Sequence, residues 1–500
     1  MKHIKVSIIG FVLLLFTGGI MVPRSDAKLA TERWTRLTEE ERHQLIRAER
    51  YFEQQNFKNA RSEYELFLQL YTRSETASYA QLMFAECTRQ LGKVNTAIGE
   101  FRNVLDYFPD SIDAGTAQYS IGVCWTQTGD VAEAVKAFEK VAARWPKTEF
   151  GANARSEVCK VYWRLGQTAK WVDHMRYLAT GEYTAPRNLR NSSQQRLLAH
   201  LLMERKTADA FILVEQAKPN NPLQTFAEWT YHAIRYLPTY YGEEGTKAKP
   251  IVAADAVAFI EKQPVDNTEL KTSLEHWSAR IVSLAGELEK TIERFAALTK
   301  RHPENDTFRR EYAQYLRSGG KRAEARLVYR DIKDQYYADS QIAETWLEEK
   351  NAKRAVEDYR AMLEKHPDKV GAIQWRLGEI LQHSSRRYAE AIACYNQSQR
   401  EPQSLFRIAE CQGALKKHDS AIQTLVSVLN FFKSAAPEAH YRMAAYHDAK
   451  GDKPAAIRTL KTVCKNYLKT PWAARAHQDL SLNYGVDVTL GGAANEKDRN

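Results

Sequence analysis

The chain has 500 residues, of which 72 are lysine or arginine and 62 are aspartate or glutamate, so its formal net charge is +10 at pH 7. This excess is small for the length, and no Lys/Arg run of the kind that binds nucleic acid occurs. Composition therefore argues against a nucleic-acid partner. A weak attraction to anionic glycans or lipid head groups stays open, because a mildly basic surface favours them.

Residues 1–27 predict a secretory signal peptide. A short basic segment precedes an apolar run from Val6 to Val22, and small residues lead to a cleavage point after Ala27. No Cys directly follows the apolar run, which argues against a bacterial lipoprotein. The run is also close to the lower limit for crossing a bilayer, about 17 residues, so an uncleaved anchor is the alternative. We expect an exported protein of the periplasm or cell envelope.

Residues 28–187 predict a regular block of helical hairpins. Residues 28–37 read as a linker, and the Thr38 to Glu41 segment is a capping box that opens the first helix. The hairpins are expected at 38–75, 78–112, 115–149 and 152–187.

The hairpin at 115–149 shows the pattern most completely. Its first helix ends at Gly129-Asp130, because Gly adopts the left-handed conformation at low cost and Asp caps the next helix. Its second helix carries Ala134 and Phe138 on one apolar stripe and ends before Pro146. Two amphipathic helices bury only part of each stripe, so such a unit needs neighbours.

A small residue precedes a proline by twelve positions five times along the chain. The pairs are Ala97 and Pro109, Ala134 and Pro146, Ala210 and Pro222, Thr291 and Pro303, and Ala355 and Pro367. A small side chain is needed where two helices cross closely, because a larger one would overpack. Period and pattern together resemble the tetratricopeptide repeat, a helix-turn-helix unit of about 34 residues.

This resemblance implies an all-α fold, an α-solenoid of stacked helix-turn-helix repeats forming a superhelix. The first block is also similar to the repeat domains of periplasmic cell-division coordinators and outer-membrane assembly lipoproteins, although the lipid-attachment Cys and the N-terminal coiled coil are missing. The family binds peptides and proteins on the groove lined by the first helix of each hairpin.

The pattern weakens over residues 188–269 and returns over residues 270–484. In the weak region, residues 237–250 predict an inserted loop, either a contact loop or hinge or a loop without a specific role, because two Pro and two Gly interrupt the helical pattern. In the second block, the unit at 371–402 holds one extra residue in its turn. A final helix at 472–483 is expected to close the last hairpin, and residues 485–500 are expected to be disordered.

The six cysteines are expected to be packing residues and not disulfides. Cys87, Cys124 and Cys411 each lie five residues before a predicted inter-helix turn, so they occupy equivalent sites in different hairpins. Helices pack about 8 to 10 Å apart, whereas a disulfide needs Cα atoms within about 7 Å.

Motifs for catalysis, metal binding or a cofactor are not found. The sequence has no His-Glu-x-x-His, no Gly-x-Ser-x-Gly, no Cys-x-x-Cys and no complete P-loop. We therefore expect no enzyme activity, no metal and no cofactor.

The resemblance implies that the second, fifth, ninth and twelfth positions of each repeat face a bound partner. Counted back from the turn glycine at position fifteen, the candidate partner-binding residues are Tyr79, Leu82, Glu86, Arg89, Tyr119, Val123, Thr126, Asn153, Lys160 and Trp163. Packing between repeats is the alternative role for some of them, Tyr119 and Trp163 in particular.

The sequence thus predicts a non-enzymatic scaffold that binds partner proteins or peptides in a bacterial cell envelope. The alternative is a glycan- or peptidoglycan-associated solenoid subunit in polysaccharide export or in cell-wall or outer-membrane assembly. Exposed aromatic and basic side chains suit either role.

Overall fold

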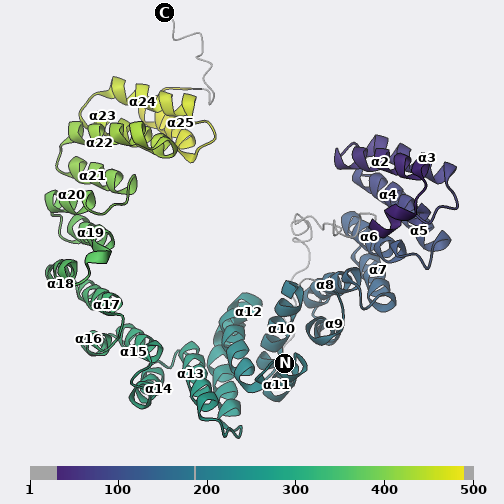
Figure 1. Ribbon diagram of the computed structural model, residues 1–500, viewed down its shortest axis with the longest axis horizontal. Coiled ribbons are helices and arrows are strands. Elements are labelled where there is room, and N and C mark those ends of the chain that lie inside the picture. Colours follow the sequence, from purple (N-terminus) through teal and green to yellow (C-terminus); the bar gives the residue numbers. More distant parts are fainter. Residues whose placement is uncertain (1–30, 185–186, 489–500) are drawn as a thin grey trace, which may run out of the picture. The chain divides into compact units, whose positions relative to one another are not determined.

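The computed structural model describes residues 31–184 and 187–488, which form α-helices with short 3-10 and π turns and no strand (Figure 1). The predicted all-α class is therefore confirmed. The signal peptide predicted at 1–27 lies outside the described residues, as do residues 489–500 of the disordered tail predicted at 485–500. Of the tail's first four residues, which are described, Val486 and Val488 pack against the core of the last hairpin. The described helices divide into two compact units, with the boundary between Glu287 and Leu288. The block boundaries at 187/188 and 269/270 stay predictions.

The first unit contains helices α1 to α13. Their bounds are α1 (Thr31–Arg36), α2 (Glu39–Glu53), α3 (Phe57–Leu70), α4 (Ala77–Gln90), α5 (Val94–Tyr107), α6 (Asp113–Thr128), α7 (Val131–Arg144), α8 (Glu149–Arg164), α9 (Thr168–Thr180), α10 (Arg187–Met203), α11 (Thr207–Gln216), α12 (Pro222–Glu261) and α13 (Thr268–Leu284).

The second unit contains helices α14 to α25 and three short turns. Their bounds are α14 (Leu288–Arg301), α15 (Asp306–Ser318), α16 (Arg322–Arg330), α17 (Gln335–Glu348), α18 (Ala352–Lys365), η1 (Pro367–Lys369), α19 (Val370–Glu379), η2 (Ile380–Ser384), α20 (Tyr388–Asn396), α21 (Gln403–Ala414), α22 (His418–Phe431), η3 (Lys433–Ala435), α23 (Ala436–Ala449), α24 (Lys453–Asn466) and α25 (Pro471–Tyr484). The predicted final helix at 472–483 is confirmed.

The residues directly before the first hairpin are helical, although a linker was predicted there. Helix α1 is held by Arg33, whose guanidinium donates to both carboxylate oxygens of Asp113 at 3.1 and 3.0 Å. Asp113 is buried and also accepts a hydrogen bond from Ser78. A buried carboxylate needs such partners, so this contact fixes α1 to the starts of α4 and α6.

Consecutive helices form hairpins, in which the first member is here called the A helix and the second the B helix. Each hairpin turns at one residue with positive φ. These turn residues are Gln55, Gly92, Gly129, Gly166, Arg205, Gly242, Gly320, Lys350, Arg386, Lys416 and Gly451. Gly286, which follows the A helix α13 at the end of the first unit, also has a positive φ. In most hairpins the next N–H bonds to the carbonyl five residues earlier, as from Lys93 to Thr88 at 3.2 Å, which satisfies the end of the A helix.

Small residues sit where A and B helices cross. All five small residues of the twelve-residue pattern are buried, which confirms their predicted packing role. Gly122 on the A helix α6 shows why a small residue is needed at such a crossing. A Cβ added there would lie 2.6 Å from the ring of Phe138 on α7. Gly378 stands in the same relation to Tyr395, at 2.8 Å. The aromatic ring of the B helix therefore occupies the space that a side chain on the A helix would fill.

The prediction of a loop at residues 237–250 is wrong, because these residues are helical on both sides of Gly242. That glycine has φ 58° and ψ −132°, a conformation open mainly to glycine. A Cβ built on Gly245 would lie 2.2 Å from the carbonyl oxygen of Leu237. Eight residues of continuous helix span about 12 Å, so the chain reverses at Gly242 and α12 is itself a hairpin.

Packing explains why the two prolines within α12 do not break it. Pro238 and Pro250 each remove a backbone donor, but the neighbouring Ile234, Leu237 and Val252 are buried in the core of the first unit. Burial of such side chains contributes roughly 1.5 to 3 kcal/mol each, which outweighs the loss of a hydrogen bond.

The extra residue predicted in the 371–402 unit is confirmed as a π turn, η2. The N–H of Arg387 bonds to the carbonyl of Leu381, six residues earlier, whereas most of the other turns have a bond to the carbonyl five residues earlier. A π turn holds one more residue than the α-helix over the same rise, so the insertion is absorbed inside the A helix.

All six cysteines are buried and none is paired, which confirms their predicted role as packing residues. They lie in six different hairpins, on A helices or B helices, within the apolar clusters of their units.

Candidate functional site

The predicted partner-binding residues divide by burial, and five of them lie inside the helix stack. Tyr79, Leu82, Glu86, Tyr119 and Val123 are each less than a tenth exposed. The Tyr79 hydroxyl donates to Glu49 at 2.5 Å, and the Tyr119 ring lies 5.2 Å from that of Phe138. Their visible contacts are therefore packing contacts within the unit.

The other five predicted residues reach the surface in part. Arg89, Thr126, Asn153 and Trp163 are half-buried and Lys160 is exposed. Arg89 donates to Glu86 at 2.8 and 2.5 Å, and the Thr126 hydroxyl donates to the Gly122 carbonyl at 3.0 Å. A partner-binding role for the ten residues stays a prediction.

Trp163 belongs to a cluster that the sequence did not single out. The cluster, here called the Arg196 cluster, comprises Trp163 on α8, Trp171 on α9, Arg196 and His200 on α10, and Tyr240 and Tyr241 on α12. The guanidinium carbon of Arg196 lies 5.1 Å from the ring centroid of Trp163, 5.7 Å from that of Trp171 and 5.8 Å from that of Tyr240. Rings from two A helices and one B helix thus surround one cation, which is carried by a third A helix.

The rings of the Arg196 cluster also contact one another. Trp163 lies 4.9 Å from Trp171 and 5.4 Å from Tyr241, and Trp171 lies 5.0 Å from His200, measured between ring centroids. These separations are typical of attractive aromatic pairs. The Nδ1 atom of His200 lies 3.0 Å from the Tyr241 hydroxyl.

Arg196 supplies the positive charge of this cluster at neutral pH. Burial lowers the pKa of His200, because the imidazolium form loses hydration. Burial likewise raises the pKa of the Tyr241 hydroxyl. His200 and Tyr241 are therefore neutral near pH 7, whereas an arginine stays charged.

No described residue gives the Arg196 guanidinium a hydrogen bond or an ion pair. Its Nε atom is buried and has no hydrogen-bond partner within the described ranges, and the same holds for Nε1 of the fully buried Trp171. The residue as a whole is half-buried, so part of it stays open to solvent. The cluster therefore presents N–H donors that nothing in the described protein satisfies.

Aromatic residues continue from this cluster along the A helices α12 and α13. Tyr236 is 48% exposed, and its ring lies 6.3 Å from that of Tyr240. Trp277 on α13 is half-buried, 5.7 Å from the ring of Tyr231 and 4.8 Å from the guanidinium carbon of Arg280. The first unit thus carries a row of partly exposed rings and cations on its A helices.

The A helices of the second unit carry arginines whose charge is neutralised internally. Arg376 on α19 donates to both carboxylate oxygens of Glu344 on α17 at 2.8 Å. Arg442 on α23 donates to Glu410 on α21 at 2.5 Å, and Arg407 donates to the same glutamate at 3.0 Å. This Glu-Arg ladder ties successive A helices together.

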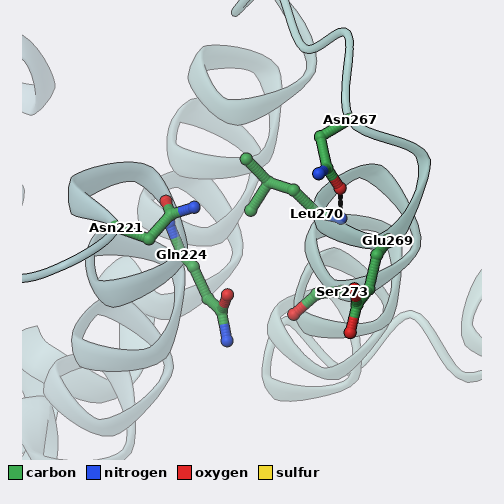
Figure 2. Close-up of a pocket in the computed structure, with 6 residues that line it drawn as sticks. All are labelled: Asn221, Gln224, Asn267, Glu269, Leu270 and Ser273. Atoms are coloured by element: carbon green, nitrogen blue, oxygen red, sulfur yellow. Dashed lines mark hydrogen bonds between the residues drawn. The ribbon is translucent and has the colours of Figure 1, made fainter.

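A shallow cleft of about 340 Å³ separates the starts of α12 and α13. Figure 2 shows Asn221 and Gln224 from α12 on one side, and Asn267, Glu269, Leu270 and Ser273 from α13 on the other. Asn221 and Asn267 already cap their own helices, accepting from the N–H groups of Gln224 at 3.1 Å and Leu270 at 2.8 Å. The cleft contains no unsatisfied buried group that would attract a ligand.

In the described part of the chain, no three His, Cys, Asp or Glu side chains are grouped so as to hold a metal ion. Among residues 31–184 and 187–488, no helix has both the length and the apolar composition needed to cross a bilayer.

The sequence does not predict the Arg196 cluster, because the repeat pattern weakens over residues 188–269. The signal was present in the spacing: Gly242 follows Arg205 by 37 residues, as Gly92 follows Gln55 and Gly129 follows Gly92. With Gly242 assigned as a turn, Tyr240 and Tyr241 fall at the end of an A helix.

Family models identify helical repeats in three segments of the chain. One model of the tetratricopeptide repeat matches residues 82–148 and 285–339, and a second such model matches residues 403–433. A comparison with curated proteins gives no match.

Solved helical structures resemble the chain at low sequence identity. The hetero-tetramer of Cut9 and Hcn1 from the APC/C shares 12% identity, covering 90% of this chain and 99% of the other, with a TM-score of 0.28. Naa15/Naa10 bound to HypK-THB shares 13% over 89% and 71%, with a TM-score of 0.37. Yeast Tom70 shares 12% over 88% and 94%, with a TM-score of 0.31. At such TM-scores these structures say nothing about what this chain binds.

The stacked hairpins, the small residues at the helix crossings and the matching models agree with one another. The chain is an α-solenoid of helix-turn-helix units, and its segments 82–148, 285–339 and 403–433 match the tetratricopeptide repeat.

Proposed function

We propose that the chain is a non-enzymatic scaffold of the bacterial cell envelope, which binds partner proteins through the A helices of its first unit. Helical repeat solenoids of this type typically serve protein–protein interaction. The observation that carries the proposal is the row of partly exposed aromatic and cationic side chains on α8, α10, α12 and α13. Aromatic residues and arginine are the residue types that dominate binding energy at protein interfaces.

Site-specific crosslinking tests the binding face. Tyr236 is replaced by a photo-crosslinking phenylalanine in the full chain, and Lys140, an exposed residue of the B helix α7, is replaced in the same way as the control. We expect protein adducts from position 236 and few from position 140. Equal labelling at both positions, or none, would contradict a binding face on the A helices.

A glycan-associated role is the alternative, because aromatic rings and cations also bind sugars and anionic polymers. Co-sedimentation of the full chain with purified cell-wall polymer distinguishes the two roles. Binding to the polymer that requires Tyr236 and Trp277, without protein adducts at position 236, would favour the glycan-associated role.

Export is tested separately with residues 1–40 fused to alkaline phosphatase, an enzyme that is active only outside the cytoplasm. We expect activity from the fusion and its loss when Leu13 and Leu14 are both changed to Arg, since charge in the apolar run blocks the signal. Equal activity of both fusions would refute the signal peptide.

A further inference from the structure

One set of arginines recurs at the same place in the repeat. Arg196, Arg407 and Arg442 each lie nine residues before the left-handed turn residue of their hairpin, which is Arg205, Lys416 and Gly451 respectively. Arg376 lies ten residues before Arg386, and the residue inserted at η2 accounts for the difference. The four side chains therefore occupy equivalent positions on A helices.

Three of these four arginines have a glutamate partner within the chain. Glu344 and Glu410 each lie six residues before their own turn residue, and each pairs with the arginine of the following A helix, Arg376 and Arg442. Arg407 pairs with Glu410 on its own helix. A carboxylate next to the arginine is thus the rule in the second unit.

Arg196 is the exception, because neither of the two positions that hold a glutamate in the second unit holds one here. The preceding A helix, α8, has Lys160 six residues before its turn, and α10 itself has Ala199 there. Lys160 pairs with Glu157 at 2.6 Å. Arg196 instead has the rings of Trp163, Trp171 and Tyr240 around it and no carboxylate among the described residues.

An arginine held in this way is prepared for a carboxylate. The rings fix the guanidinium by cation–π contact and leave its N–H groups without acceptors. A guanidinium fork matches the two oxygens of a carboxylate, and the bond is strong in a partly desolvated site. The half-buried position keeps it within reach of a ligand from solvent.

We propose that the Arg196 cluster binds an acidic side chain, Glu or Asp, of a partner protein, in place of the glutamate that the second unit supplies from its own chain. This inference rests on the proposed scaffold function and assigns the partner's chemistry. A single planar guanidinium fork suits one carboxylate better than a phosphate dianion, which requires more cationic partners.

The test measures binding of fluorescein-labelled hexaglutamate, acetylated and amidated at its ends, to the full chain by fluorescence anisotropy. Arg196→Met keeps the apolar stem and removes the charge. Arg164→Met is the matched control, because Arg164 is an exposed arginine of α8. We expect Arg196→Met to weaken binding by about tenfold or more, equivalent to about 1.4 kcal/mol, and Arg164→Met to change it by less than about twofold.

A second pair of variants keeps Arg196 and tests whether position 160 is equivalent to the positions of Glu344 and Glu410. Lys160→Glu puts a carboxylate where Glu344 and Glu410 stand, so it should occupy Arg196 and weaken peptide binding more than Lys160→Gln does. Since Lys160 is exposed, neither variant is expected to disturb folding. Equal binding by Lys160→Glu and Lys160→Gln would argue against the equivalence.

The outcomes separate this inference from the proposed function. Wild-type affinity in Arg196→Met, equal binding of hexaglutamine, or displacement of the peptide by inorganic phosphate at lower concentration than by free glutamate would overturn the carboxylate site. If protein adducts at position 236 persist in that case, the scaffold function stands alone. If hexaglutamate binding depends on Arg196 but no adduct forms, the carboxylate site stands and the scaffold proposal fails.

Discussion

Arg376 on α19 donates two hydrogen bonds, each of 2.8 Å, to the carboxylate of Glu344 on the preceding A helix α17. Tyr359 on α18 donates a third to the same carboxylate at 2.6 Å. One glutamate therefore joins three helices of two successive hairpins. Burial alone would raise the pKa of Glu344, but the hydrogen bonds from Arg376 and Tyr359 outweigh it, so the pKa lies below its usual value.

We predict that acid weakens the second unit through this carboxylate. A lowered pKa in the folded state means that the stabilisation is present above the usual glutamate pKa of about 4.3 and is lost as the pH falls below it. Glu344→Gln should cost about 1 kcal/mol at pH 7, since both partners are partly exposed, and should reduce the loss on acidification. Hydrogen exchange of α17 and α19 at pH 7 and pH 3 measures both effects. Glu364→Gln, at an exposed position of α18, is the control, and an equal change in both variants would refute the prediction.

Two helical glycines are predicted to respond in opposite directions to alanine. Gly122→Ala places a methyl group 2.6 Å from the Phe138 ring and should destabilise the first unit by about 1 to 3 kcal/mol through overpacking. Gly99→Ala on α5 meets no atom within 4 Å and should stabilise it by about 0.5 to 1 kcal/mol, because alanine loses less backbone entropy. Urea unfolding followed by circular dichroism measures both. A Gly122→Ala variant as stable as Gly99→Ala would mean that Phe138 moves aside freely.

Tyr119 and Lys160, both predicted to bind a partner, should differ in their effect on stability. Tyr119 is 3% exposed and packs on Phe138, so Tyr119→Ala should cost about 3 to 5 kcal/mol, as for other buried aromatic residues. Lys160→Ala should change stability by less than about 0.5 kcal/mol, since Lys160 is exposed. Thermal unfolding of the two variants checks this. A neutral Tyr119→Ala would restore this residue as a candidate surface contact.

The six cysteines should be unreactive in the folded chain and all reactive after unfolding. Burial raises the pKa of Cys124, Cys159 and Cys411 to about 12, so little thiolate forms near pH 8. A thiol-reactive reagent should label few thiols under native conditions and six in denaturant without reductant. Fewer than six in denaturant would indicate a disulfide and contradict the packing role.

Sequence reasoning located most of the hairpins, because Gly at a turn and a small residue twelve before a proline each have a direct steric cause. It placed the turns less well where another residue is left-handed. Lys350 and Arg386 have φ of 59° and 53°, whereas the sequence predicts these two turns one residue away, at Asn351 and at Ser384-Ser385. Lysine and arginine carry no local signal for this conformation, which the helix packing imposes.

The candidate site was predictable only in part, because a binding residue and a packing residue share one helical stripe. Trp163 was found from the register alone. Arg196 stands out because it has no carboxylate partner among the described residues. This absence can be seen only when neighbouring A helices are compared in the structure. Tyr240 and Tyr241 were assigned to a loop because Pro238 and Gly242 outweighed a spacing of 37 residues in the prediction.

The π turn at residues 380–384 shows how such a chain can change length without losing its contacts. The inserted residue lies after Arg376 and Glu379 and before the turn, so Arg376 still reaches Glu344 on the previous A helix and pairs with Glu379 on its own helix. Insertions at the same place in other hairpins should therefore be tolerated, whereas a residue added nearer the start of an A helix would rotate every later side chain by about 100°. The end of each A helix is thus a natural place to lengthen this protein by evolution or by engineering.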